Sequence, residues 1–364
     1  MDIALRRAFW AGLLILPVIA IGSGIWSRRD RAADSGWPQT ARHIVDPESG
    51  NGYWLEQVFG PAGRERIAAT LIRPDDERSR SLLIAVSGSG DGLEPAEGAL
   101  QRRLVRHGYA VLRLGKKGVG ASSGNWRNEN FEERARNVRA ALDWAAARPD
   151  LDAHRIVLYG HSQGGYVIPL VADDPRVAAL ILAAGSARSV RDQIADEWYE
   201  TARRTGADEA QARRRAARNQ RWLDIALAGC PVLRYHYLCH VYDYDPATAL
   251  ASVRKPVLAL FAENDVMVPP STNLARMRTL LAENAAVRFA VLPRSNHMFW
   301  TSVSGLPDEY AELLGPVAAF PHAQPGNADH ERLGGQWVNR APYAKGYFEE
   351  IDAFLGRHVP QVEA

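Results

Sequence analysis

Three residues whose types together perform nucleophilic catalysis occur in the order serine, aspartate, histidine. Ser162 is the centre of a G-x-S-x-G pattern at residues 160–164, and Asp265 and His297 follow it. A serine hydroxyl becomes a nucleophile when an imidazole takes its proton and a carboxylate fixes the tautomer of that imidazole. We therefore expect Ser162 to be the nucleophile, His297 the base and Asp265 the acid that orients the base. Glu263 is the alternative acid, because it is only two residues from Asp265.

The serine stands where a strand should turn sharply into a helix. Residues 155–159 are rich in β-formers, and residues 166–172 are compatible with a helix. Neighbouring chains crowd such a turn, so small residues are needed two positions before and after the serine, as Gly160 and Gly164 provide. The backbone amide of Gln163, at the helix start, would then point at a developing oxyanion.

The second oxyanion donor should come from the glycine-rich loop at residues 88–90, and we assign it to the backbone amide of Ser89. The alternative is that these glycines only make a turn. The chain has ten histidines. His161 flanks the serine inside the turn, so its ring is expected to point away from the nucleophile, and most of the others are expected at surface or capping positions.

Apolar strands that alternate with helices predict an α/β fold. Such an alternation predicts a doubly wound, mostly parallel sheet that binds ligands outside the carboxyl ends of its strands. Asp265 and His297 each follow a predicted strand, which is where the fold would need them. The expected strands are residues 53–59, 66–73, 81–86, 109–114, 155–159, 177–184, 257–261 and 287–292, and the main helices 94–107, 129–148 and 346–358.

Length and composition are those of an ordinary globular protein. The chain has 364 residues, of which 46% are hydrophobic and 24% charged. This is enough for one large α/β domain, which we place at residues 48–364. The formal net charge is only +2 and no basic tract is present. These features argue against nucleic acid as a partner.

The amino-terminal region contains 18 uncharged, mostly apolar residues, 9–26, with arginine pairs on both sides. A helix of this length is just long enough to cross a bilayer. We predict a signal-anchor or signal peptide at residues 1–29, with a small-residue cleavage site near residues 20–22, and a linker at residues 30–47. The catalytic part is expected outside the cytoplasm, anchored in the membrane or, after cleavage, periplasmic or secreted.

Two cysteines, Cys230 and Cys239, lie in a long insertion, residues 186–254, of which residues 188–228 are Arg- and Ala-rich and helical in pattern. His236 and His240 are close in sequence, but no ligand set has the usual spacing of a zinc site. A disulfide is favoured if the protein is exported, and two free thiols are the alternative.

These features resemble the α/β-hydrolase superfamily, in particular bacterial serine esterases related to the prolyl oligopeptidase and dienelactone hydrolase groups. The resemblance covers roughly residues 53–359. It implies a triad of Ser162, Asp265 and His297, and a lid formed by residues 186–254. Relatives carry His-Gly at residues 87–88, where this chain has Ser-Gly, and often Asp-Lys-Arg-Gly at residues 115–118, where no catalytic consequence is expected. The similar segments are residues 87–90, 108–113, 117–122, 160–165, 264–265 and 296–297.

The expected reaction is therefore hydrolysis of a carboxylic ester through an acyl-enzyme, without a metal or an organic cofactor. A serine peptidase or a thioesterase with the same triad is the alternative, and a non-catalytic binding protein is a further one. Apolar side chains near the triad suggest a small-molecule ester with an apolar acyl or aryl group. A second insertion is expected at residues 301–341. The apolar residues beside the base are Met298, Phe299 and Trp300. The aromatic candidates for an acyl pocket, which are more often packing residues, are Trp198, Tyr199, Trp222, Tyr235 and Tyr237.

Overall fold

The computed structural model describes residues 41–46, 49–62, 65–76, 80–91, 98–230, 237–309 and 342–361. The predicted apolar segment at residues 9–26 and the start of the linker lie outside these residues. So does most of the second predicted insertion. Within the described ranges, no helix is both long and apolar enough to cross a membrane.

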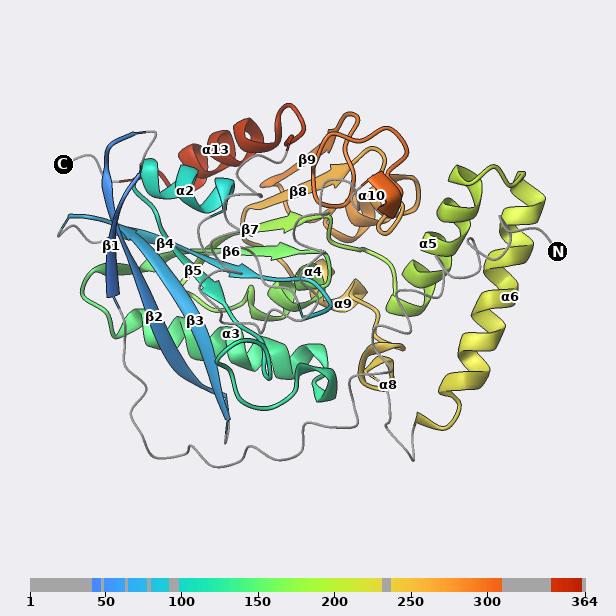
Figure 1. The fold of residues 1–364 in the computed structure, drawn as a ribbon, viewed down its shortest axis with the longest axis horizontal. Helices are drawn as coiled ribbons and strands as arrows, with labels where there is room; N and C mark the ends of the chain where they lie inside the picture. The colour runs from blue at the N-terminus through green and yellow to red at the C-terminus, as the bar shows by residue number, and fades with distance from the viewer. Residues whose placement is uncertain are drawn as a thin grey trace. The chain divides into compact units, whose positions relative to one another are not determined.

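The described residues form one sheet of nine strands, in the order β1-β2-β3-β5-β4-β6-β7-β8-β9 (Figure 1). Strands β1 to β3 are antiparallel, and β3 pairs antiparallel with β5. From β5 to β9 every neighbouring pair is parallel, which confirms the mostly parallel sheet expected from the sequence. The strands are β1 (Ala41–Val45), β2 (Gly52–Ala62), β3 (Glu65–Pro74), β4 (Arg80–Val86), β5 (Ala110–Leu114), β6 (Leu151–His161), β7 (Val177–Ala183), β8 (Val257–Ala262) and β9 (Val287–Leu292).

Helices cover both faces of the sheet because the central strands are apolar on both sides. In β4 every residue is buried. Leu82 and Ile84 belong to the core under α3 (Phe131–Ala146) and α10 (Pro270–Leu280). Leu83 belongs to the core under α2 (Ala99–Arg106) and α13 (Tyr347–His358). Successive side chains of a strand point to opposite faces, so one apolar run serves both cores.

The structure differs from the expected elements at two places. β1 forms within the stretch predicted as a linker. It is an edge strand with a mostly exposed sequence, so it lacks the buried alternation that would reveal it. The helix expected at residues 166–172 is shorter, with α4 (Gly164–Val167) followed by the 3-10 turn η2 (Ile168–Val171). Pro169 lies in that turn and cannot donate a backbone hydrogen bond.

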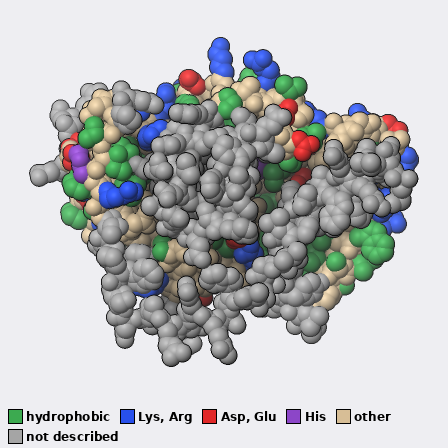
Figure 2. All heavy atoms as spheres, viewed as in Figure 1, with side chains coloured by type: hydrophobic (Ala, Val, Ile, Leu, Met, Phe, Trp, Pro, Cys, Tyr) green, Lys and Arg blue, Asp and Glu red, His purple; other side chains and the backbone are tan. Residues whose placement is uncertain are grey.

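The predicted insertion between β7 and β8 is helical. It contains α5 (Val190–Arg204), α6 (Glu209–Leu227), α8 (Leu238–Val241) and α9 (Ala247–Ala251). Helices α5 and α6 lie side by side as a hairpin, beyond the carboxyl ends of strands β6 to β8 (Figure 1). Hydrophobic and basic side chains are exposed together in this part of the surface (Figure 2).

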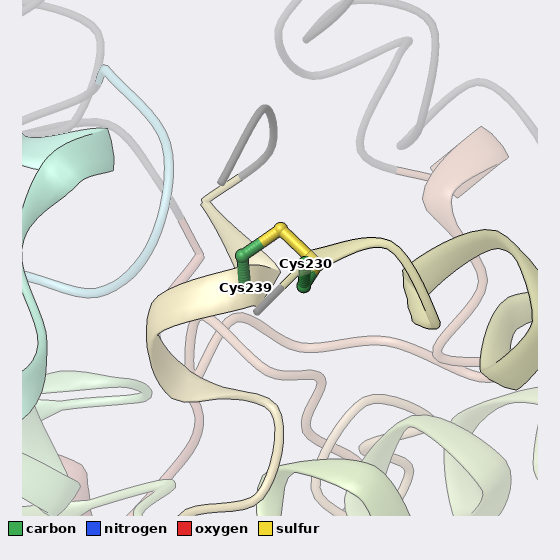
Figure 3. Close-up of a disulfide and its surroundings, with 2 residues drawn as sticks. All are labelled: Cys230 and Cys239. Atoms are coloured by element: carbon green, nitrogen blue, oxygen red, sulfur yellow. A yellow bond between two sulfur atoms is a disulfide. The ribbon is translucent and has the colours of Figure 1, made fainter. Parts of the chain in front are cut away.

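Cys230 and Cys239 form a disulfide within this insertion, with their Cα atoms 5.1 Å apart (Figure 3). The alternative prediction of two free thiols is therefore wrong. The disulfide also removes both thiolates from any zinc site. His236 lies outside the described residues. Among the residues that are described, no cluster of three or more His, Cys, Asp or Glu could hold a metal ion.

Candidate active site

Ser162 occupies a strained turn between β6 and α4. Its φ is 52°, in the left-handed region that costs energy for a residue other than glycine. The Ser162 amide donates to the carbonyl of Ala183 at 2.9 Å, which ties the turn to the end of β7. A Cβ at Gly160 would lie 2.6 Å from the carbonyl oxygen of Gly164, and one at Gly164 2.2 Å from that of Val86. Both glycines are thus required by contact with backbone.

His297 and Asp265 are brought together at the ends of β9 and β8. Nδ1 of His297 lies 2.7 Å from Oδ2 of Asp265, and both residues are buried. Oδ1 of Asp265 accepts the amides of Met267 and Val268 at 2.8 and 2.9 Å, so the carboxylate is fixed on both oxygens. Burial would lower the pKa of His297, but the charge of Asp265 and its hydrogen bond outweigh burial and raise that pKa above its ordinary value.

Glu263, the alternative acid, has a different partner. Its side chain is exposed, and Oε2 accepts the backbone amide of Arg294 at 2.7 Å. The geometry therefore favours Asp265 over Glu263 as the carboxylate for His297.

The ring of His161, expected to point away from the nucleophile, lies against the segment of the candidate base. The ring is buried, and Nε2 lies 3.0 Å from the carbonyl oxygen of His297. The centroids of the two imidazole rings are 5.0 Å apart. A carbonyl oxygen only accepts hydrogen bonds, so Nε2 of His161 must carry the proton. Burial and the neighbouring His297 lower the pKa of His161 to about 4, so the ring is neutral near pH 7. His161 thus links the nucleophile turn to the backbone of the candidate base.

The loop after β4, predicted to supply an oxyanion donor, passes close to Ser162. A Cβ at Gly88 would lie 3.0 Å from Cβ of Ser162. Ser89 is the next residue and is exposed. The amide of Ser89 shares a peptide plane with the carbonyl of Gly88, and in a trans peptide the two groups point in opposite directions.

Two buried cations hold this loop, and the sequence did not reveal either. Nζ of Lys116 donates to the carbonyl oxygens of Gly88, at 3.0 Å, and of Gly90. Lys116 is only 3% exposed. The guanidinium of Arg134 donates to the carbonyl of Ser87 at 2.8 Å and to the side chain of Gln163 at 2.6 Å. Lys116, from the segment at residues 115–118, thus binds the loop at residues 87–90.

Strained backbone conformations occur after the carboxyl ends of several strands. In the described part of the chain, four residues other than glycine have positive φ: Ser162, Ala184, Arg294 and Phe299. Ala184 follows β7, and Arg294 follows β9. Such strain persists only where the surrounding structure holds it, and it is frequent at functional sites.

The aromatic residues expected near the pocket or beside the base lie partly in the core and partly on the surface. Phe299 and Trp300 are buried at 1% and 3% exposure, and Phe299 stacks on Tyr347 with centroids 4.9 Å apart. Trp222 is 66% exposed on α6, and Trp198 packs against the core. Tyr235 lies outside the described residues. Tyr237 packs against the same core, with its ring centroid 5.5 Å from that of Trp126.

A cavity of about 510 Å³ lies away from these residues, between α2 and strands β2 and β3. Its charged lining is largely paired internally, as in the ion pairs of Arg106 with Asp46 and of Arg80 with Asp76. No candidate catalytic residue lines it.

The sheet, the strained serine turn after β6 and the histidine–carboxylate pair after β9 and β8 are together typical of one class of enzyme, the α/β hydrolases. The sequence profile of the Alpha/beta hydrolase family matches residues 83–313. The chain therefore belongs to the α/β-hydrolase superfamily. The resemblance expected from the sequence is thereby confirmed.

Curated relatives are distant. The quorum-quenching protein AidA of Acinetobacter baumannii is 30% identical over 118 residues, which are 32% of this chain and 39% of AidA. The α/β hydrolase domain-containing protein WAV2 of Arabidopsis thaliana is 27% identical over 52% of this chain and 54% of its own length. The chain therefore spans about half or less of these two relatives. An uncharacterized protein of Mycobacterium tuberculosis is 26% identical over 78% of this chain and 88% of its own length.

Solved structures with a similar fold include an esterase of Pyrococcus furiosus, with a TM-score of 0.48 and 13% identity over 79% of this chain and 91% of the esterase. An acylaminoacyl peptidase of Pyrococcus horikoshii has a TM-score of 0.48 and 15% identity over 77% of this chain and 43% of the peptidase. At these identities and scores the similarity carries no information on the substrate.

Proposed function

We propose that the protein is a serine hydrolase that cleaves carboxylic esters through an acyl-enzyme. The observation that carries the proposal is the buried 2.7 Å contact between His297 and Asp265, at the same edge of the sheet as the strained turn of Ser162. A buried imidazole with a fixed tautomer is what an alcohol nucleophile requires.

In this mechanism Oγ of Ser162 attacks the ester carbonyl, and Nε2 of His297 takes the hydroxyl proton. The amides of Gln163 and Ser89 stabilise the negative charge that develops on the carbonyl oxygen. The bond to the alcohol then breaks, and His297 returns the proton to the departing oxygen. A water molecule, deprotonated by the same imidazole, attacks the acyl-enzyme and releases the acid.

The substrate that we propose is a small-molecule ester with an apolar acyl or aryl group. A serine peptidase or thioesterase would use the same three residues, so the choice depends on the leaving group. The test compares p-nitrophenyl esters of increasing acyl length with matched thioesters and peptide anilides. The proposal predicts turnover of esters that Ser162→Ala removes. It fails if the folded protein cleaves only anilides or only thioesters.

We also propose that the catalytic part is located outside the cytoplasm, anchored through residues 9–26 or released by cleavage. The Cys230–Cys239 disulfide supports this, because disulfides persist in oxidising compartments. The location is tested by fusing the amino-terminal part of the chain to a phosphatase that is active only after export. A fusion after residue 40 that remains inactive in cells would contradict it.

A further inference from the structure

Helix α5 of the insertion lies against the segment that carries Asp265. Residues at positions i, i+4, i+7 and i+11 of a helix share one face, and in α5 these are Gln193, Glu197, Glu200 and Arg204. Three of the four bond to residues 264–271. The bonds run from Gln193 to the carbonyl of Met267, from the Ser271 hydroxyl to Glu200 at 3.3 Å, and from Arg204 to Oδ1 of Asn264 at 3.0 Å.

Glu197 is in the middle of this docked face, and its side chain is half-buried where α5 meets the segment that carries Asp265. Its position agrees with the electrostatics. A charge on Glu197 contributes to raising the pKa of His297, and the charge of Asp265 contributes to raising the pKa of Glu197. The docking of this helix face on residues 264–271 and these mutual charge effects agree in placing Glu197 near the histidine–carboxylate pair.

A basic neighbour of Glu197 in the described part of the chain is the imidazole of His297, which is a cation only when protonated. The hydrogen-bond partner of Glu197 is Gln193, on its own helix, and no Lys or Arg of the described residues forms an ion pair with it. The adjacent Asp196, in contrast, pairs with Arg188 at 3.0 Å. A half-buried carboxylate without a permanent counter-charge is costly, and a cationic ligand would remove that cost.

A second side chain that interacts with Glu197 is aromatic. Burial, and to a smaller extent the charge of Glu197, raises the pKa of Tyr237 to about 12. The phenol of Tyr237 is therefore neutral. An aromatic ring next to a carboxylate is a favourable environment for an ammonium group. The groups that interact with Glu197 through charge are thus His297, Asp265 and Tyr237, and Gln193 interacts with it through a hydrogen bond.

We propose that Glu197 forms a subsite for a positively charged group of the substrate, so that the preferred esters carry an ammonium group in addition to the scissile carbonyl. This inference depends on the proposed ester hydrolysis and narrows its substrate class. It also gives the insertion a role in specificity, because the subsite is on α5 while the candidate triad is on the sheet.

Two pairs of esters of equal shape test the subsite on either side of the carbonyl. The acyl-side pair is p-nitrophenyl 6-aminohexanoate and p-nitrophenyl heptanoate. The alcohol-side pair is butyrylcholine and 3,3-dimethylbutyl butyrate. We expect the cationic member of at least one pair to have a kcat/KM about tenfold above its neutral partner, as for a partly buried charge pair. Burial raises the pKa of Glu197 to about 7, so this ratio should increase between pH 6 and pH 8, as the carboxyl group ionises.

Glu197→Gln should bring the ratio of cationic to neutral kcat/KM close to one. Glu200→Gln is the matched control, because it removes a carboxylate from the same helix face, and it should preserve the ratio. Equal kcat/KM within both pairs in the wild type, or a preference that survives in Glu197→Gln, would overturn the subsite while leaving ester hydrolysis intact. If none of the four esters were cleaved, the proposed function itself would fail.

Discussion

The ammonium group of Lys116 donates a 3.0 Å hydrogen bond to the carbonyl oxygen of Gly88. Because this carbonyl is directed at Lys116, the amide of Ser89 in the same peptide plane points away from it. We therefore expect Lys116 to act as a positioning residue that sets the orientation of this candidate oxyanion donor.

Lys116→Met should lower kcat about ten- to a hundredfold and leave KM nearly unchanged, since an oxyanion donor acts mainly in the transition state. Lys116→Arg should recover part of the loss, because a guanidinium also donates to carbonyl oxygens. Lys255→Met removes a lysine far from the loop and serves as the control. Steady-state kinetics on a single ester measure all three. A rise in KM with kcat unchanged would contradict the positioning role.

The pH dependence of kcat/KM reports the protonation of His297, because only the neutral imidazole accepts a proton. The pKa of His297 is raised, so activity should increase with pH through an inflection above the ordinary imidazole value of about 6.5. Asp265→Asn removes the charge that raises this pKa, so the inflection should move to lower pH and kcat should fall roughly a thousandfold or more. Glu263→Gln should change neither strongly. A larger loss of kcat in Glu263→Gln than in Asp265→Asn would assign the acid to Glu263.

His161 should make the fold sensitive to acid. Its pKa is lowered to about 4 in the folded protein, whereas the unfolded chain takes up the proton near pH 6.5. The unfolded state therefore binds more protons between these values, and stability falls as the pH decreases from about 6.5 to about 4. At pH 4.5 the loss due to His161 should be roughly 2 to 3 kcal/mol.

His161→Gln keeps a donor for the carbonyl of His297 and removes the titration. Urea unfolding of both proteins at pH 7 and pH 4.5 measures the difference. An equal loss of stability in both proteins would show that His161 does not titrate in this way.

The sequence predicted the parts of the site that depend on local pattern. The turn of Ser162 needs glycines at fixed spacing, and Asp265 and His297 follow apolar strands in the expected order. The supports of the site were not predictable, because their bonds join side chains to distant backbone. Lys116 is 28 residues from its partner Gly88, and His161 is 136 residues from His297. Such contacts leave no periodicity in the sequence.

The position of Glu197 illustrates the same limit for the insertion. Helical spacing identifies which α5 residues share a face, but it does not say which face meets the sheet. That is decided by bonds from α5 to the segment after β8, such as the one between Arg204 and Asn264. An acid within an Arg- and Ala-rich helix is ordinarily a solvated surface residue, so its proximity to His297 needed the fold.

The central claim is that Ser162 is a nucleophile activated by His297. Incubation of the purified part from residue 32 onward with a fluorophosphonate, followed by peptide mass spectrometry, tests it most directly. We predict an adduct on Ser162 in the wild type and none in His297→Gln, with both proteins folded by circular dichroism. A folded wild-type protein that remains unlabelled, or an adduct that forms equally in His297→Gln, would contradict the claim.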